Sequence, residues 1–320
     1  MRTAAPFDLP PEKKRALARG KRLTWWTLAH HASAITLLYF TLGNSQAMKV
    51  AWMEDLLSLI PAIAFLVGAR VSQRRPNPEY PYGYLRATTV AYLVGSVALL
   101  VLGTFLFFDS ALKLVKAEHP TIGSVELFGH SVWLGWLMML ALLWSGTPTV
   151  LFGRWKLPVA HELHDKVLYA EAVMNKADWM TAGAALLGVV GIGLGWWWAD
   201  AVAAGVIAID IAHDGKKHLC AALGDLMDRA PRTLDYKHHV ELPERIRQTL
   251  ESLDWVEGAR VRVREDGHLF FADVELVPRR DTPDLVKRLT RTAQDLRRLD
   301  WRLHEVLLVP VERFTPPRPA

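Results

Sequence analysis

The sequence predicts an α-helical membrane protein with six transmembrane helices, followed by a small α+β domain in water. Three observations lead to this fold class. The chain is apolar with few charges up to about Asp228, whereas the residues after Pro231 are rich in Arg, Glu and Asp. The apolar part divides into segments that are each long enough to cross a membrane as a helix. Past Pro231 the hydrophobic period alternates between helical and extended.

Six apolar segments reach the ~20 residues that a membrane-crossing helix needs. Gly195 and Trp196 alone separate the last two segments, so we expect a tight hairpin there. The chain therefore divides into a basic N-terminal arm (1–23), a six-helix transmembrane domain (24–230) and a C-terminal domain (231–320). The predicted spans cover residues 24–46, 48–71, 89–115, 131–153, 167–194 and 197–219.

Basic residues indicate how the spans are oriented. The loops at 72–88 and 154–166 and the segment after the sixth span hold most of the Lys and Arg, on the side of the basic N-terminal arm. Cytoplasmic loops carry such an excess. The tryptophans at 25–26 and 196–198 support the predicted spans, because they lie at the two membrane–water interfaces, where tryptophan is enriched. We expect a multi-pass protein of the inner membrane with both termini in the cytoplasm.

The last 90 residues or so predict a small domain of order αββαβ. A helix at 243–253 precedes a strand at 256–264, and Asp266-Gly267 forms the turn to a second strand at 268–277. Thr282-Pro283 starts an amphipathic helix over 282–299, and a last strand runs from His304. This order is that of a ferredoxin-like α+β domain. It is small enough that pairing with a second copy would help to complete its core.

Acidic residues lie inside two of the predicted spans. Glu171, Asn175 and Asp178 follow each other at i, i+4 and i+7, so they share one stripe of the fifth span. Glu54 and Asp55 lie in the second span. A carboxylate at membrane depth costs about 2.5–3.5 kcal/mol on insertion scales, so two acidic helices suggest a cation path. The alternative is that Asp178 lies near a helix end or bonds to a neighbouring backbone.

Composition narrows the other classes of function. One cysteine, Cys220, excludes an intramolecular disulfide and a Cys-rich metal cluster. The formal net charge of +5 comes from basic residues beside apolar spans, which is typical of membrane orientation and not of nucleic-acid binding. No phosphate-binding Gly-rich loop, HExxH motif or nucleophile elbow stands in the sequence, so we do not expect an enzyme.

Several local motifs resemble the cation diffusion facilitator family of dimeric divalent-cation/proton antiporters. The motifs are EDLLSLIP, YPYGYLRA, NKADWMTAG, WWADAVAA and LGDLMDRAP, and they extend from the second span to the end of the sixth. The resemblance implies export of a divalent cation from the cytoplasm in exchange for protons. It also implies a homodimer and assigns the C-terminal domain to dimerisation.

The family's transport site uses a D/H-x-x-x-D pair on each of spans two and five. In this sequence the pairs fall on Asp55 and Leu59, and on Met174 and Asp178, so only two of four positions are acidic. Oxygen-rich coordination of this kind suits Mn²⁺, Fe²⁺ or Mg²⁺ better than Zn²⁺, and we expect a transported cation and no resident cofactor. Replacement ligands lie nearby in Asn175, Glu54 and Glu171.

Other metal positions of the family are also replaced. Tyr80 and Tyr84 stand where the loop after span two usually has histidines. The metal-binding histidines of the C-terminal domain are replaced by Arg260, Glu275 and Val309. Dimerisation is therefore the expected role of this domain, ahead of metal sensing.

Some alternatives remain open from the sequence. His30 and His31 either relay protons or face a wet crevice or a backbone. His161, Glu162, His164 and Asp165 either collect a metal or are only solvated. Asp210, His213 and Asp214 either line the inner vestibule or mark where the sixth span leaves the lipid. A facilitator-like protein that carries an organic cation, or one that serves as a non-transporting membrane partner, is the alternative function. Carboxylates converging within about 5 Å would favour a metal. Carboxylates facing a wide aromatic cavity would favour an organic cation.

Overall fold

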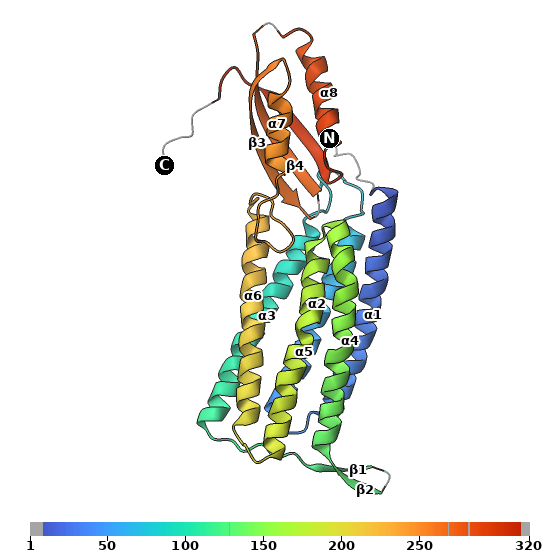
Figure 1. The fold of residues 1–320 in the computed structure, drawn as a ribbon, viewed down its shortest axis with the longest axis vertical. Helices are drawn as coiled ribbons and strands as arrows, with labels where there is room; N and C mark the ends of the chain where they lie inside the picture. The colour runs from blue at the N-terminus through green and yellow to red at the C-terminus, as the bar shows by residue number, and fades with distance from the viewer. Residues whose placement is uncertain (1–8, 128, 268, 281, 315–320) are drawn as a thin grey trace. The chain divides into compact units, whose positions relative to one another are not determined.

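A computed structural model describes residues 9–127, 129–267, 269–280 and 282–314. The chain forms two compact units. One contains Pro11–Arg74 and Ala87–Leu223 and is a bundle of long helices (Figure 1). The other contains Arg75–Arg86 and Gly224–Ala320 and includes a three-stranded sheet.

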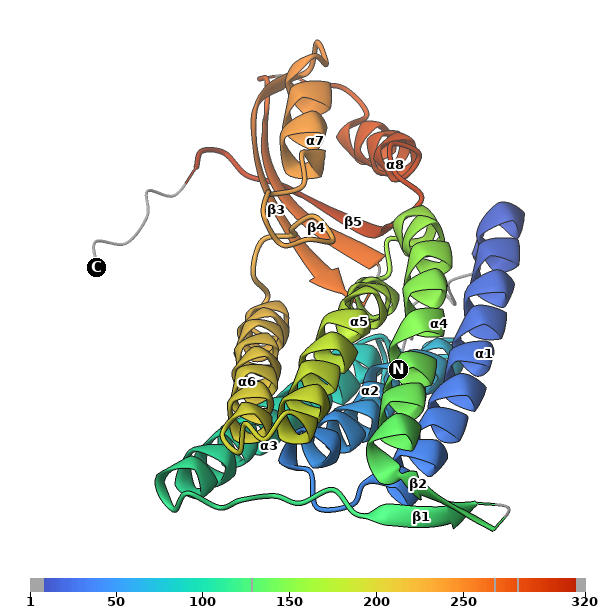
Figure 2. The same ribbon diagram turned by 60° about the horizontal axis from the view of Figure 1, so that its bottom comes forward.

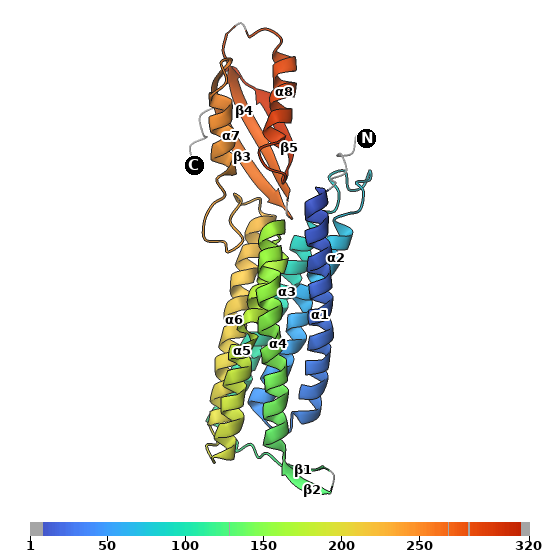
Figure 3. The same ribbon diagram turned by 45° about the vertical axis from the view of Figure 1, so that its right-hand side comes forward.

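Six long helices make up the bundle, and they run roughly alongside one another in all three views (Figures 1, 2 and 3). Within the described residues, α2, α3 and α4 are long and apolar enough to cross a membrane. α4 packs along both α1 and α5, and α2 packs against α1, α3 and α5. The helices are α1 (Pro11–Thr41), α2 (Gln46–Val71), α3 (Ala87–Val115), α4 (Leu134–Leu163), α5 (Lys166–Gly193) and α6 (Ala199–Leu226).

The boundaries of α1 and α4 differ from the predicted spans. α1 begins at Pro11, inside the segment expected to be a basic arm. Residues 124–127 and 130–133 form an antiparallel hairpin, β1 (Ser124–Leu127) and β2 (His130–Trp133), so α4 begins only at Leu134.

α4 also continues past the predicted end of its span. It runs through most of the expected 154–166 loop, which is therefore helical, and places Lys156 inside the bundle. His164 then adopts the left-handed conformation, and Asp165 caps α5 by accepting from the backbone N–H groups of Val167 and Leu168.

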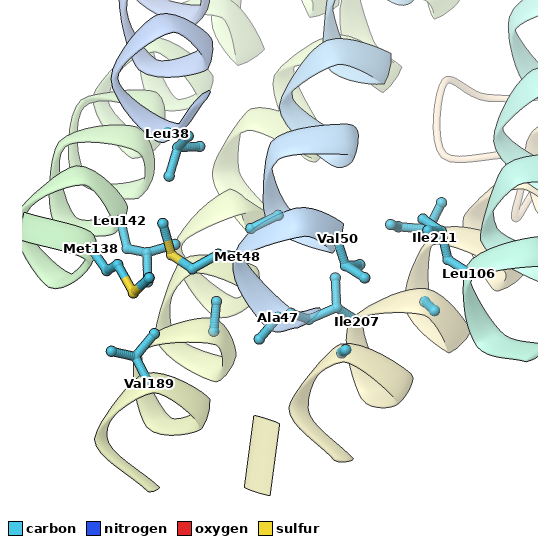
Figure 4. Close-up of a cluster of buried hydrophobic side chains, with 14 of the residues drawn as sticks. Leu38, Ala47, Met48, Val50, Leu106, Met138, Leu142, Val189, Ile207 and Ile211 are labelled. Atoms are coloured by element: carbon cyan, nitrogen blue, oxygen red, sulfur yellow. The ribbon is translucent and has the colours of Figure 1, made fainter. Parts of the chain in front are cut away.

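Apolar side chains from all six helices meet toward the end of the bundle where α2 begins (Figure 4). Figure 4 shows Leu38 of α1, Met48 of α2, Met138 and Leu142 of α4 and Val189 of α5 converging. Because lipid is as apolar as these side chains, close packing is what holds such helices together.

Asp200 connects α6 to the start of α2. Its buried carboxylate accepts hydrogen bonds from the Ser45 hydroxyl at 2.6 Å, the Ala47 backbone N–H at 3.1 Å and the Gln46 backbone N–H. These are donors at a helix N-terminus, which a negative charge stabilises. The acid of the WWADAVAA motif therefore has a structural role, as a cap for a neighbouring helix.

The C-terminal part confirms the predicted αββαβ order. The sheet has the order β3-β4-β5, with β3 antiparallel and β5 parallel to β4. Ile246, Leu250, Phe270 and Leu296 pack in its core, so both helices cover a buried face of the sheet. The elements are α7 (Leu242–Glu251), β3 (Val256–Asp266), β4 (Leu269–Pro278), α8 (Leu285–Arg297) and β5 (Leu303–Pro310).

Arg86 holds together three segments of the second unit. Its guanidinium bonds to Asp266 at the end of β3, at 2.7 Å, and pairs with Asp228 after α6. The arginine of the YPYGYLRA motif therefore links its own loop to the C-terminal domain and to the segment that leads into it.

Candidate cation site

Asp55 of α2 and Asp178 of α5 are both buried, with 4% and 7% of their surface exposed. The two helices that carry them pack against each other. The Ser145 hydroxyl of α4 donates a hydrogen bond to Asp55 Oδ2 at 2.7 Å. A carboxylate that accepts such a bond is fixed in orientation, which favours binding of a cation in one defined position.

His31 of α1 lies beside Asp55. Its ring is fully buried, and its Nδ1 lies 3.8 Å from Asp55 Oδ1. Asn175 and Asp178 of α5 also interact with this ring. The site is therefore formed by four helices, α1, α2, α4 and α5, and not by α2 and α5 alone.

Several buried polar atoms in this region lack a hydrogen-bond partner among the described residues. They are both ring nitrogens of His31, Asn175 Nδ2 and Asp178 Oδ2. More than nine in ten buried polar groups are normally satisfied by protein or water, so open groups that cluster need an explanation. A cation or ordered water between them would provide one.

Glu171 has a different environment from Asp178, although both lie on α5. Its carboxylate, 1% exposed, forms an ion pair with Lys156 of α4, whose ammonium is also fully buried. The Thr24 hydroxyl of α1 donates to its other oxygen at 3.3 Å. A cation would have to displace Lys156 to bind Glu171.

Glu54 lies next to Asp55 on α2, about 100° further round the helix. Its carboxylate is half-buried and accepts a hydrogen bond at 2.9 Å from the Thr181 hydroxyl of α5. Among the described residues, no three His, Cys, Asp or Glu side chains gather closely enough to hold a metal ion. The ligand set of Asp55, Asp178, Asn175, Glu54 and Glu171 therefore stays a prediction.

The other candidates have contacts of their own. His161 packs edge-on against Tyr169, with ring centroids 5.6 Å apart, Glu162 lies 3.7 Å from Arg19, and Asp165 is the cap of α5. Tyr80 and Tyr84 contact each other with ring centroids 4.6 Å apart. On α6, Asp210 and His213 are exposed.

The sequence did not indicate the roles of Ser145 and Lys156. Ser145 is one small polar residue in an apolar helix, which is common and carries no signal. Lys156 was assigned to a loop because charges follow residue 153, although the apolar residues LPVA at 157–160 continue the helical pattern. That continuation was the available signal.

A family model described as the cation efflux transmembrane domain matches residues 28–227, which contain this site. The chain belongs to the cation diffusion facilitator family. The predicted resemblance is thus confirmed, and this family is one of metal-cation transporters and not of enzymes.

Three relatives, two named for manganese efflux and one for zinc transport, are similar to this chain over most of its length. The manganese efflux system protein MneS of Bacillus subtilis (strain 168) is 24% identical over 76% of this chain and 77% of its own. The manganese efflux system protein MneP of the same organism is 23% identical over 73% and 75%. The zinc transporter ZitB of Escherichia coli (strain K12) is 22% identical over 81% and 79%.

Proposed function

We propose that this facilitator exports a divalent metal cation from the cytoplasm in exchange for protons. One observation carries the proposal: two buried carboxylates, on α2 and α5, lie beside unpartnered polar atoms inside the domain that matches the cation efflux model. Buried acids without a fixed counter-charge are costly at membrane depth, and they mark ion pathways.

Asp55 and Asp178 are the proposed charged ligands, and Asn175 is the third donor through its amide oxygen. Glu54 is a reserve ligand that also faces α5, where it bonds to Thr181. Glu171 becomes available only when Lys156 leaves it. Two carboxylates and an amide form an oxygen-rich set that suits Mn²⁺ or Fe²⁺, or Mg²⁺, better than Zn²⁺. The two relatives named for manganese efflux support manganese as the first cation to test.

Protons are the proposed counter-ions because they compete for the same carboxylates. When a divalent cation leaves, two buried negative charges repel each other, and a proton relieves this repulsion. Binding of the metal must then release protons. The metal affinity should fall as the pH falls, because protonated carboxylates are lost as ligands.

The proposed setting is the inner membrane, with six crossings by α1 to α6 and both termini in the cytoplasm. The side-specific excess of Lys and Arg supports the orientation, and the apolar α2, α3 and α4 support insertion. Residues 231–320 are the proposed dimerisation domain of a homodimer.

The test is ion transport by the purified protein in proteoliposomes with a pH dye inside. Mn²⁺, Fe²⁺, Zn²⁺, Co²⁺ and Mg²⁺ are compared, using wild type, Asp55→Asn and Asp178→Asn. We expect metal-dependent proton movement in wild type and loss of it in both variants. Leu59→Ala is the control, since it should affect packing only.

Two results would overturn the proposal. One is that no metal moves protons with the wild type. The other is that both Asn variants transport normally. An organic cation or a non-transporting role in the membrane would then replace the metal.

A further inference from the structure

We propose that His31 of α1 supplies a nitrogen ligand to the transported cation, and that this ligand favours a first-row transition metal over Mg²⁺ and Ca²⁺. The inference rests on the proposed function and makes the site more specific. It adds a third helix to the binding set, because Asp55 lies on α2 and Asp178 on α5.

The first step is that the buried His31 ring has no hydrogen bond to the described part of the protein. The ring is fully buried, and neither of its nitrogens has a hydrogen-bond partner among the described residues. A neutral imidazole always carries one N–H donor and one lone pair, so both are left unused here. Buried polar groups normally find partners, which indicates that something binds at this ring.

His30 provides an internal comparison. Consecutive helical residues point about 100° apart, so the two rings face different neighbours. His30 Nε2 lies 3.3 Å from the Ser145 carbonyl oxygen, and its ring packs near Trp144 and Phe152, with centroids 5.4 and 5.7 Å away. His30 is therefore held by the protein itself, and His31 is the open ring.

The surroundings of His31 are those of a cation ligand. Nδ1 lies 3.8 Å from Asp55 Oδ1, which is beyond hydrogen-bond distance but close enough for both to reach one ion. On α5, Asn175 and Asp178 face the same ring, and each has an unpartnered polar atom. Two buried carboxylates near this ring, those of Asp55 and Asp178, supply negative charge that attracts a cation.

The chemistry of this set selects the class of metal. Mg²⁺ and Ca²⁺ bind oxygen ligands, and Mg²⁺ loses its water reluctantly. Imidazole suits zinc, iron, nickel and copper, whereas carboxylates suit manganese and magnesium. A set of one imidazole nitrogen with carboxylate and amide oxygens therefore favours a transition metal over Mg²⁺, since the nitrogen suits Fe²⁺ and Zn²⁺ and the oxygens suit Mn²⁺. The carboxylates alone would also accept Mg²⁺. The His31 nitrogen would make Mg²⁺ a poorer ligand partner than a transition metal.

The experiment is electron paramagnetic resonance of Mn²⁺ bound to the full-length protein, with histidine labelled by ¹⁵N. A labelled nitrogen that binds Mn²⁺ directly gives an isotropic ¹⁵N coupling, whereas a nitrogen that is only nearby gives a weak dipolar coupling. We expect the isotropic ¹⁵N coupling in wild type and in His30→Asn, and its loss in His31→Asn. The Mn²⁺ dissociation constant should rise about 10- to 100-fold in His31→Asn, in the range seen when a metal site loses a supporting group. The Mg²⁺ dissociation constant should change less than about threefold, because Mg²⁺ makes little use of a nitrogen ligand.

The possible results separate this inference from the proposed function. If wild type binds Mn²⁺ but shows no histidine coupling, or if the coupling persists in His31→Asn, the ligand role is wrong and the transporter proposal stands. If wild type binds none of Mn²⁺, Fe²⁺, Co²⁺ and Zn²⁺, the proposed function itself fails. If His31→Asn fails to fold, histidine coupling in wild type that persists in His30→Asn supports the ligand role of His31. Loss of the coupling in His30→Asn would overturn it.

Discussion

At the scale of single residues, the site depends on how Asp55 is held. The carboxylate lies between the Ser145 hydroxyl on one side and the His31 ring on the other. A hydrogen bond to a charged group contributes about 1.5–3 kcal/mol, more than a neutral one. Under the proposed function Ser145 is thus a positioning residue, because it orients the Asp55 carboxylate without binding the ion itself.

Ser145→Ala should weaken Mn²⁺ binding about tenfold, the lower end of the effect expected when a ligand loses its supporting hydrogen bond. Isothermal titration of the purified protein measures the dissociation constant. Ser96→Ala is the matched control, since the buried Ser96 hydroxyl bonds only to the Tyr92 carbonyl of its own helix. Equal affinity of Ser145→Ala and wild type would show that Asp55 needs no support from α4.

The sequence showed Asp55 and Asp178 as acids inside the spans but not the side chains that lie beside them. Asp55 and Asp178 were predictable because a charge in an apolar segment stands out. The place of His31 beside Asp55 depends on how α1 packs against α2, which no spacing within either helix specifies. Glu171 was predicted as a ligand for the same reason as Asp178, and its partner Lys156 comes from a helix whose end was predicted too early.

At the scale of elements, α4 and α5 are joined by a buried ion pair. Lys156 and Glu171 are 0% and 1% exposed and lie where the two helices pack together. Glu171 lies seven residues before Asp178, about 10 Å along the helix axis. The ion pair therefore keeps the ammonium near the site while it neutralises one of the acids on α5.

Removing one partner should destabilise the bundle more than removing both. Lys156→Met or Glu171→Gln leaves the other group buried without its partner, at a cost of about 3–5 kcal/mol by analogy with soluble proteins. The double variant should recover most of this loss. Thermal unfolding in mild detergent measures the order of the four proteins. A double variant that is as unstable as the sum of the single ones would contradict the pairing.

Glycines let α3 and α6 approach closely. A Cβ added at Gly103 would lie 2.5 Å from the Ala212 backbone nitrogen, and one at Gly215 would meet the Leu100 backbone in the same way. Small residues at such contacts are typical of helix pairs in membranes. Gly103 and Gly215 are therefore required because the facing backbone leaves no room for a Cβ atom.

Gly103→Ala should lower the unfolding temperature, because backbone must move to admit the methyl group. Gly205→Ala is the matched control on α6: a Cβ there meets nothing within 4 Å. It should be neutral or stabilising, since Ala is favoured over Gly in a helix by about 1 kcal/mol. If both variants unfold alike in detergent, the α3 and α6 contact is looser than described.

At the scale of the whole molecule, the order of helices and strands followed from the sequence better than their ends did. Span length and the αββαβ pattern predicted every element except the β1 and β2 hairpin, whose strands are only four residues each. The helical continuation past residue 153 was missed because charge was taken as the end of a span. Charges remain inside a bundle when another helix supplies the counter-charge, and a single sequence does not show which helix does so.

The proposed homodimer gives a further prediction. Full-length protein in mild detergent should sediment as a dimer, and deletion of residues 231–320 should shift it toward monomer. A monomeric full-length protein would contradict the proposed homodimer.

A reporter fused after Ala320 should be active only in the cytoplasm if both termini lie there. A reporter active only outside would contradict the cytoplasmic position of the C-terminus.

Uptake of radioactive Mn²⁺ into proteoliposomes with an acidic interior tests the central claim most directly. We predict that wild type accumulates Mn²⁺ while the internal pH rises, and that collapsing the pH gradient stops accumulation. Asp178→Asn should do neither, because its site lacks one of the two charges that the cation and protons share. Accumulation by Asp178→Asn equal to that of wild type would contradict cation transport through this site.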